Sequence, residues 1–115
     1  MSTRPLRRVA WIAGISLAIA ACAGTQVAAD RITSPGQALF NGWTKADVDC
    51  YTCHDGDGSG TWRGPDLATR VPTLTDEEIA DTIREGPSIM PSFEDELSDA
   101  EIGQIVAWLR QRFPQ

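Results

Sequence analysis

The sequence predicts an all-α domain with three main helices joined by long loops. Two stretches, Thr75–Glu78 and Ser98–Glu101, have the capping-box pattern, in which a Ser or Thr N-cap is followed three residues later by Glu. Residues 102–113 carry apolar side chains at the i, i+3, i+4, i+7 spacing of an amphipathic helix. No stretch alternates apolar and polar residues for more than a few positions, so no sheet is expected.

The first main helix is predicted to begin at Ser34 and Pro35. Serine can cap a helix, and proline suits the first helical position because its missing N–H would have no partner there. Gly42 is expected near the end of this helix, since glycine weakens a helix interior. The apolar face is expected to consist of Leu39, Phe40 and Trp43.

The second and third main helices follow the two capping boxes. After Thr75 the pattern directs Ile79 and Ile83 inward and stops at the Gly-Pro pair of residues 86–87. After Ser98 the helix continues until Pro114 ends it. The residues expected on the buried face of this third helix are Ile102, Ile105, Val106, Leu109 and Phe113.

Residues 1–22 have the pattern of an export signal. Three arginines precede a 13-residue apolar run, Val9–Ala21, which is short for a membrane span. The run ends in Ile-Ala-Ala-Cys, which resembles a bacterial lipobox, so Cys22 is expected to become the lipidated first residue. Ordinary cleavage between residues 21 and 29 and an uncleaved anchor are the alternatives. The predicted organisation is therefore 1–22 signal peptide, 23–33 tether and 34–115 folded domain.

The mature chain is predicted to be strongly acidic. The full sequence has 10 basic and 16 acidic side chains, and loss of three arginines with the signal leaves 7 against 16, a net charge of −9. Such a surface disfavours nucleic acid and anionic lipid. It favours a protein partner with a basic docking patch, chiefly by raising the association rate. Alternatively, the charge only keeps the protein soluble.

The segment Cys-Tyr-Thr-Cys-His at residues 50–54 is the attachment motif of c-type haem. Its two thiols can each add across one vinyl group of a porphyrin, and His54, the only histidine, can then bind the iron. A thioredoxin-type dithiol would need a strand–helix context. A structural zinc site would need four ligands, and the mature domain has only three. One haem c, attached through Cys50 and Cys53, is the predicted cofactor.

Met90 is the predicted second ligand of the iron. It is the only methionine once Met1 leaves with the signal, and it lies between Pro87 and Pro91 in a loop between two helices. Flanking prolines stiffen such a loop, which suits a weak thioether ligand that must be held in place. The alternative is a methionine that fills a gap in the core, although a loop between prolines is a poor core position.

Together these motifs resemble class I c-type cytochromes of the small bacterial single-domain kind, over nearly all of residues 34–115. The Gly-Pro-Asp-Leu segment at 64–67 resembles the family's Gly-Pro-x-Leu, and residues 86–93 match its distal ligand loop. The resemblance implies a cytochrome c-like fold with long loops around one haem. One departure is that Phe40 lies ten residues before Cys50, whereas the family's first helix usually runs closer to the motif.

The resemblance also implies roles for single residues. The carbonyl of Pro65 would accept a hydrogen bond from the ring N–H of His54, which would set the orientation and basicity of this ligand. Leu109 would touch the haem. Where the first and last helices cross, a close approach at Gly36 and a contact between Phe40 and Trp108 are implied.

Trp62 and Arg63, just before Gly64, are candidates for contact with the haem propionates. Partial burial of those carboxylates would make a hydrogen-bond donor or a cation useful. Alternatively, Trp62 only covers an edge of the haem.

Residues 55–60, Asp-Gly-Asp-Gly-Ser-Gly, copy the opening of an EF-hand calcium loop. The later positions fit poorly, because position 9 is Arg63 and position 12 is Asp66 instead of Glu. The flanking segments are also not a helix pair. A glycine-rich excursion under the haem is therefore preferred to a calcium site.

The predicted function is single-electron transfer through a haem with His54 and Met90 as axial ligands, in a monomer that is not an enzyme. The expected location is the periplasmic side of a bacterial membrane, anchored through Cys22, or else the soluble periplasm. The acidic residues 94–96 are candidates for partner docking or a solvated loop. The alternatives are a haem enzyme or gas sensor, with Met90 displaced, and a structural haem subunit of a larger oxidoreductase.

Overall fold

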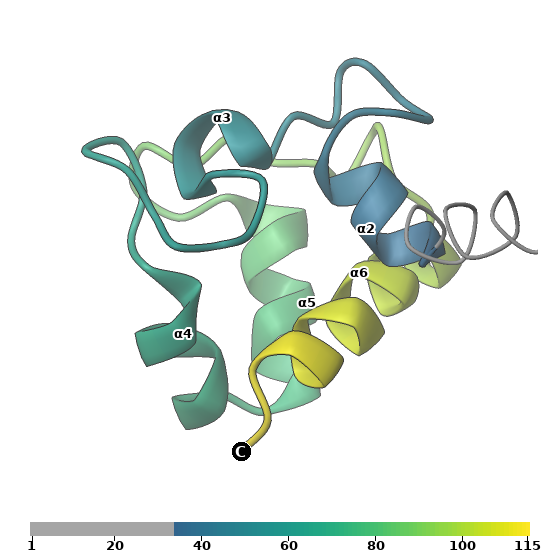
Figure 1. The fold of residues 1–115 in the computed structure, drawn as a ribbon. Coiled ribbons are helices and arrows are strands. Elements are labelled where there is room, and N and C mark those ends of the chain that lie inside the picture. The colour runs from purple at the N-terminus through teal and green to yellow at the C-terminus, as the bar shows by residue number, and fades with distance from the viewer. Residues whose placement is uncertain (1–33) are drawn as a thin grey trace, which may run out of the picture.

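The structure, a computed structural model, describes residues 34–115; the predicted signal peptide, Cys22 and the predicted tether lie outside the described residues. Within this range all regular structure is helical, as predicted, and no helix is long and apolar enough to cross a membrane. The three main helices are α2 (Pro35–Phe40), α5 (Asp76–Glu85) and α6 (Asp99–Arg112) (Figure 1). Shorter elements are α3 (Tyr51–His54), α4 (Leu67–Arg70) and the 3₁₀ helix η1 (Val71–Thr73).

Both predicted capping boxes are present. The backbone N–H of Glu78 donates to the Thr75 hydroxyl at 3.1 Å, and the Thr75 N–H donates to the Glu78 carboxylate at 2.7 Å. Ser98 and Glu101 make the same reciprocal pair at 3.2 and 2.9 Å. Each box satisfies two backbone N–H donors that would otherwise lack partners at a helix start. At the other end of α5, Gly86 adopts a left-handed conformation and terminates the helix, as predicted.

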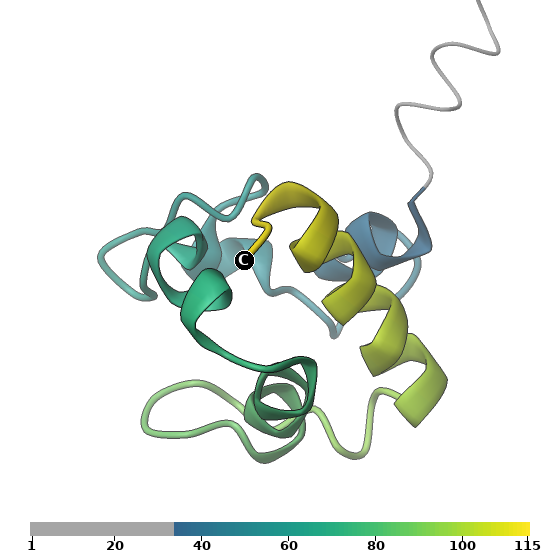
Figure 2. The same ribbon diagram turned by 90° about the horizontal axis from the view of Figure 1, so that it is seen from below.

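Helices α2 and α6 cross in close contact, and Figure 2 shows α2 lying behind the middle of α6. A Cβ atom added to Gly36 would lie only 2.0 Å from the carbonyl oxygen of Gln104 and 2.8 Å from the Cβ of Trp108. The aromatic rings of Phe40 and Trp108 pack beside this point, with their centroids 4.8 Å apart. Only glycine allows the two backbones to approach so closely.

The first helix begins as predicted, with Ser34 at the N-cap and Pro35 as its first residue, but Trp43 lies beyond its end. Ser34 occupies the N-cap position, but its side chain makes no capping hydrogen bond. The helix ends at Phe40, and the chain turns at Gly42, whose φ is +68°. Trp43 therefore follows the helix and is 56% exposed, so its predicted place on the apolar face is wrong. The positive φ redirects the chain before Trp43 can complete the helical period.

The unusually long segment 41–49 is held to the domain at two points. Val48 is fully buried in the core. The ammonium group of Lys45 donates to the carbonyl of Glu96 and to the carboxylate of Glu101, each at 2.8 Å. These contacts connect the segment before the Cys-x-x-Cys-His motif to the start of α6. The ten-residue spacing therefore forms an ordered loop that leads into α3.

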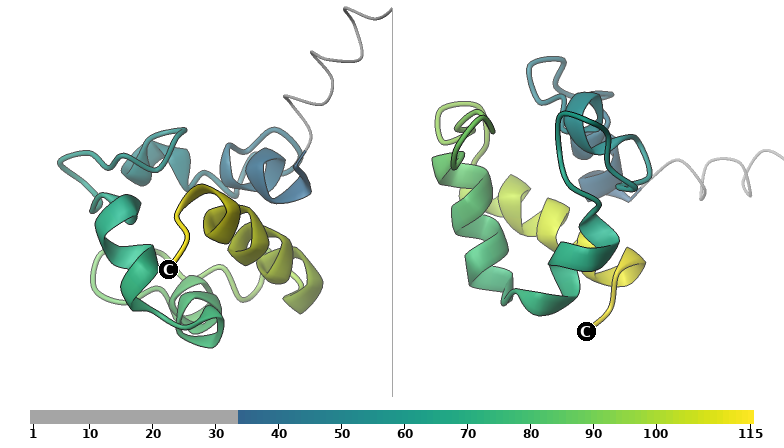
Figure 3. Two further views of the ribbon diagram at one scale, coloured as in Figure 1. Left: turned by 60° about the horizontal axis from the view of Figure 1, so that its bottom comes forward. Right: turned by 90° about the vertical axis from the view of Figure 1, so that its left-hand side faces the viewer.

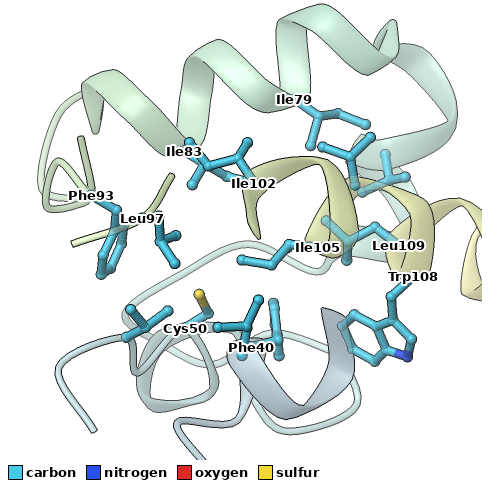
Figure 4. Packing of buried hydrophobic residues seen from close by; sticks show 14 residues of the cluster. Phe40, Cys50, Ile79, Ile83, Phe93, Leu97, Ile102, Ile105, Trp108 and Leu109 are labelled. Atoms are coloured by element: carbon cyan, nitrogen blue, oxygen red, sulfur yellow. The ribbon is translucent and has the colours of Figure 1, made fainter. Parts of the chain in front are cut away.

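The buried core lies between α5 and α6 on one side and α2 with the start of α3 on the other (Figure 4). Figure 3 shows α4 and η1 closing one end, next to the C-terminus of α6. The sulfur of Cys50 points into this core (Figure 4). The other core side chains labelled there are Phe40, Ile79, Ile83, Phe93, Leu97, Ile102, Ile105, Trp108 and Leu109.

Candidate haem-binding site

The Cys-x-x-Cys-His segment folds as a single helical turn, α3. The backbone N–H groups of Cys53 and His54 both donate to the carbonyl of Cys50, at 3.2 and 2.9 Å. Residues three apart lie on the same face of a helix. The turn therefore presents both cysteines to one side, and both line the same cavity.

Cys50 lies in an apolar environment. Its side chain is buried, and this burial raises the pKa of its thiol to about 12. A thiol with such a pKa stays protonated at neutral pH, whereas a redox-active dithiol reacts as its thiolate. The environment of Cys50 therefore argues against a redox-active dithiol. It suits a sulfur in a neutral thioether, which carries no charge to bury.

The imidazole of His54 is oriented by the segment that follows the glycine-rich loop. Its Nδ1 atom lies 3.1 Å from the carbonyl oxygen of Pro65. A carbonyl oxygen can only accept, so Nδ1 carries the proton in this hydrogen bond. The neutral ring then has its free lone pair on Nε2, the nitrogen that can bind a metal.

Two glycines allow the 55–66 loop to return to the haem motif. Gly60 has a φ of +84°, and a Cβ there would lie 2.6 Å from the backbone nitrogen of Asp66. A Cβ on Gly64 would lie 2.8 Å from the carbonyl oxygen of Cys53. Thr61 fixes the contact, because its hydroxyl donates to that same carbonyl at 2.6 Å. The Pro65 carbonyl is thus brought within reach of His54.

The loop that carries Met90 folds back onto the end of α5. The N–H of Phe93 donates to the carbonyl of Ile83 at 3.2 Å, and the Ser92 hydroxyl donates to the carbonyl of Arg84 at 2.5 Å. A Cβ on Gly86 would lie 2.3 Å from the backbone of the returning chain. The loop is therefore held by several contacts that do not involve the Met90 side chain.

One cavity of about 670 Å³ connects these segments. Its volume is within the ~300–1,000 Å³ typical of cofactor clefts. Most of its wall is apolar, with side chains such as Ile79, Ile83 and Ile105 from α5 and α6. Every predicted site residue within 34–115 lines it: Cys50, Cys53, His54, Trp62, Arg63, Pro65, Met90 and Leu109. Cys22 lies outside the described residues.

The site residues differ in exposure. Leu109 is buried in the cavity wall, whereas Trp62 is 88% exposed and its ring stacks with the guanidinium of Arg63 at 4.8 Å. Ile89, next to Met90, is also exposed at the cavity margin. The acidic residues 94–96 are exposed as well, but they do not line the cavity.

One charged residue of the cavity wall, Arg70, is not among the site residues predicted from the sequence. It lies at the end of the short helix α4, which was not predicted. A signal for this helix exists in Asp66, whose side chain accepts a hydrogen bond from the N–H of Ala68 at 2.8 Å and so caps α4. A four-residue helix offers no apolar periodicity, and a single Asp cap does not by itself predict a helix.

In the calcium-like loop, residues 55–60, the Asp57 carboxylate interacts with other groups of the protein. Hydrogen bonds from Ser59, followed by the charge of Arg112, hold the pKa of Asp57 below its usual value. The carboxylate of Asp57 lies 3.7 Å from the Arg112 guanidinium. No cluster of three His, Cys, Asp or Glu side chains within residues 34–115 could hold a metal ion. This geometry supports neither a calcium site nor a structural zinc site in that part of the chain.

An all-helical domain in which a Cys-x-x-Cys-His turn faces an apolar cavity of cofactor size is a c-type cytochrome. Residues 33–109 match the family described as cytochrome C oxidase, cbb3-type, subunit III, and the chain belongs to this family. No curated protein matches the chain. Membership indicates haem-based electron transfer, a covalently bound c-type haem and redox protein partners.

Proposed function

We propose that this domain carries single electrons through one haem c. The observation that supports this most strongly is that the predicted attachment and ligand residues all line one cavity of about 670 Å³. When bound, the haem would supply a one-electron iron couple. The residues proposed to hold it are Cys50 and Cys53 as thioether attachments, with His54 and Met90 as axial ligands.

His54 is suited to the proximal position by its hydrogen bond with Pro65. The protonated Nδ1 leaves Nε2 free for iron, and the bond restrains rotation of the ring. Donation to a carbonyl also makes the imidazole more basic, which favours the ferric state. His54 is the only histidine of the chain, so no second imidazole competes for this role.

Met90 is suited to the distal position by the rigidity of its loop. The contacts of Ser92 and Phe93 with the end of α5 hold the loop independently of any bond to iron. A ligand held in this way moves little when the iron changes oxidation state. A thioether ligand also raises the potential relative to a second histidine, as does an apolar wall that disfavours the additional charge of ferric iron.

The partner and the location follow from charge and from the N-terminal pattern. A net charge of −9 after loss of the signal supports a redox partner with a basic docking patch. We further propose that the chain is exported and anchored to a membrane through a lipid on Cys22, which places the monomeric domain on the periplasmic side.

A second candidate is a fixed electron-transfer subunit of a larger oxidoreductase. The family description, which names a subunit of an oxidase, favours this candidate. A haem enzyme or gas sensor receives less support, because the chain has no second histidine to act as a distal acid–base group.

A redox titration of the haem-loaded protein, followed by absorption spectroscopy, tests the proposal. Intact mass should show one covalent haem, and the ferric protein should show the far-red methionine–iron band. Met90→Ala should lose this band, keep the haem, and bind carbon monoxide in the ferrous state. A wild-type protein without the band would contradict His–Met ligation, and rapid turnover of a small substrate would contradict the carrier role.

A further inference from the structure

The chain between α2 and the Cys-x-x-Cys-His turn exposes two large aromatic side chains. Trp43 is 56% exposed and Tyr51 is 45% exposed, although the buried Val48 lies between them in the sequence. Neither aromatic ring lines the haem cavity, in contrast to the other exposed large hydrophobic side chains of the described domain, Trp62 and Ile89. The proposed haem site therefore does not account for the exposure of Trp43 and Tyr51.

The backbone that presents this aromatic pair is held by hydrogen bonds at the end of α2. The Gly42 N–H donates to the Leu39 carbonyl at 3.0 Å. The Trp43 N–H donates to the Ala38 carbonyl at 2.9 Å, and with the positive φ of Gly42 this is the Schellman arrangement. A Cβ added to Gly42 would lie 3.6 Å from Cε1 of Tyr51, so the Tyr51 ring lies beside the turn that carries Trp43. One ordered turn therefore positions both aromatic side chains.

The surface beside the aromatic pair is acidic. Lys45 is the only Lys or Arg of residues 41–51, and its ammonium group already contacts the Glu101 carboxylate and the Glu96 carbonyl. This contact brings the loop between α2 and α3 (Figure 1) next to the acidic residues 94–96. Four exposed carboxylates of these two segments make no salt bridge within the described part of the chain: Asp47, Glu94, Asp95 and Glu96.

We infer that Trp43 and Tyr51, together with the carboxylates of Asp47 and residues 94–96, form the docking surface for a redox protein that presents an apolar patch ringed by Lys and Arg. The inference rests on the proposed function and names the surface through which electrons reach or leave the domain. Trp and Tyr dominate the energetic centres of protein interfaces, because they bury a large area at little cost in conformational freedom. Neighbouring carboxylates attract a basic partner and raise the association rate.

The position of Tyr51 connects this surface to the haem site. Tyr51 lies in the sequence between Cys50 and Cys53, the proposed attachment residues, and it begins the single turn of α3. A partner that covers Tyr51 therefore lies within a few residues of the proposed covalent links to the haem. The unpaired carboxylates would repel an anionic bilayer, which argues for a basic protein over a lipid surface as the occupant.

The experiment is stopped-flow electron exchange between the holoprotein and a model partner of this chemistry, the lysine-rich mitochondrial cytochrome c. We expect Trp43→Ala and Tyr51→Ala to lower the second-order rate constant by about five- to tenfold, the usual loss at an interface centre. Trp43→Phe keeps an aromatic ring and should retain most of the rate. Oxidation by ferricyanide, which needs no docking surface, and the midpoint potential should stay at their wild-type values.

The acidic part of the surface is tested by Asp47→Asn. This variant should react more slowly than wild type at low ionic strength, and the difference should vanish at ~1 M salt, where the Debye length is about 3 Å. Glu77→Gln is the matched control, because it removes one exposed carboxylate from the start of α5, at the other end of the molecule (Figure 1). The control should react like wild type at each salt concentration.

Equal rates for wild type, Trp43→Ala and Tyr51→Ala would overturn the inference. Unchanged exchange with the cytochrome would also overturn it if Trp43→Ala instead abolished binding to phosphatidylcholine vesicles or dissociated a wild-type dimer, since lipid or a second copy would then cover the surface. If Tyr51→Ala does not acquire haem, the Trp43 variants carry the test, because Trp43 lies outside the attachment motif. Failure of the proposed function is distinct, because the wild-type protein itself would then lack covalent haem or the methionine–iron band.

Discussion

The Nδ1 atom of His54 lies 3.1 Å from the carbonyl oxygen of Pro65, eleven residues further along the chain. The intervening loop can return to this point because Gly64 has no side chain. A Cβ at that position would lie 2.8 Å from the Cys53 carbonyl oxygen and 3.1 Å from Cε1 of the His54 ring. Gly64 thus controls the approach of the carbonyl to the imidazole.

Gly64→Ala should therefore weaken the His54–Pro65 hydrogen bond while leaving both cysteines available for attachment. A less basic imidazole stabilises ferric iron less, so the midpoint potential should rise. Redox titration at pH 7 measures the change. A variant with full haem content and an unchanged potential would show that the carbonyl does not tune the ligand.

Gly36→Ala should strongly destabilise the domain. The new methyl group would lie 2.0 Å from the Gln104 carbonyl oxygen, and backbone atoms of two packed helices cannot move apart cheaply. We expect a loss of about 3 kcal/mol, the upper end of the usual cost of overpacking. Denaturant unfolding of the haem-loaded protein measures it.

Gly103→Ala is the matched control for both glycine variants. Gly103 lies on the exposed face of α6, and a Cβ there would meet nothing within 4 Å. The substitution should stabilise the protein by about 0.5–1 kcal/mol, because alanine loses less conformational freedom in a helix. If Gly36→Ala behaved like this control, the close crossing of α2 and α6 would be disproved.

Gly86→Ala should displace the loop of Met90. Gly86 has a φ of +63°, and a Cβ would lie 2.3 Å from the backbone at Pro91 and Ser92. The far-red methionine–iron band should weaken or disappear while the covalent haem remains. Ser92→Ala, which removes the hydrogen bond to the Arg84 carbonyl and the one accepted from the Glu94 N–H, should show a smaller effect. An intact band in Gly86→Ala would contradict the role of this glycine.

The stability of the domain should depend on the ionisation of Glu101. Hydrogen bonds from Lys45, and then from Ser98, lower the pKa of this carboxyl below its ordinary value of 4.5. Because the folded pKa is lower than the unfolded one, the ionised group stabilises the fold fully above pH 4.5. This contribution is lost as the pH falls through the folded pKa.

Glu101→Gln, which resembles the protonated acid, should therefore melt at a lower temperature than wild type at pH 6–7. The difference should shrink progressively below about pH 4. Thermal melts followed by circular dichroism measure it. Glu77→Gln, which changes an exposed charge in the first turn of α5, is the control and should show a smaller dependence. A difference for Glu101→Gln that is constant down to pH 3 would contradict the assignment.

Local signals account for the part of the structure that could be predicted. The two capping boxes place the starts of α5 and α6 at the observed residues, because a cap is formed by residues three apart. The Cys-x-x-Cys-His segment is equally local. The choice of Met90 depended on counting residue types, which also needs no structure.

By itself, the sequence therefore determined the helical class, the two longest helices and the residues proposed to hold a haem. Only the tertiary structure decided that Trp43 is exposed, that a loop tied by Lys45 leads into α3, and that Arg70 lines the cavity. The physical reason for this division is the distance along the sequence over which each interaction acts. Caps and helical periods act between neighbours, whereas burial and charge pairing depend on which distant segments meet.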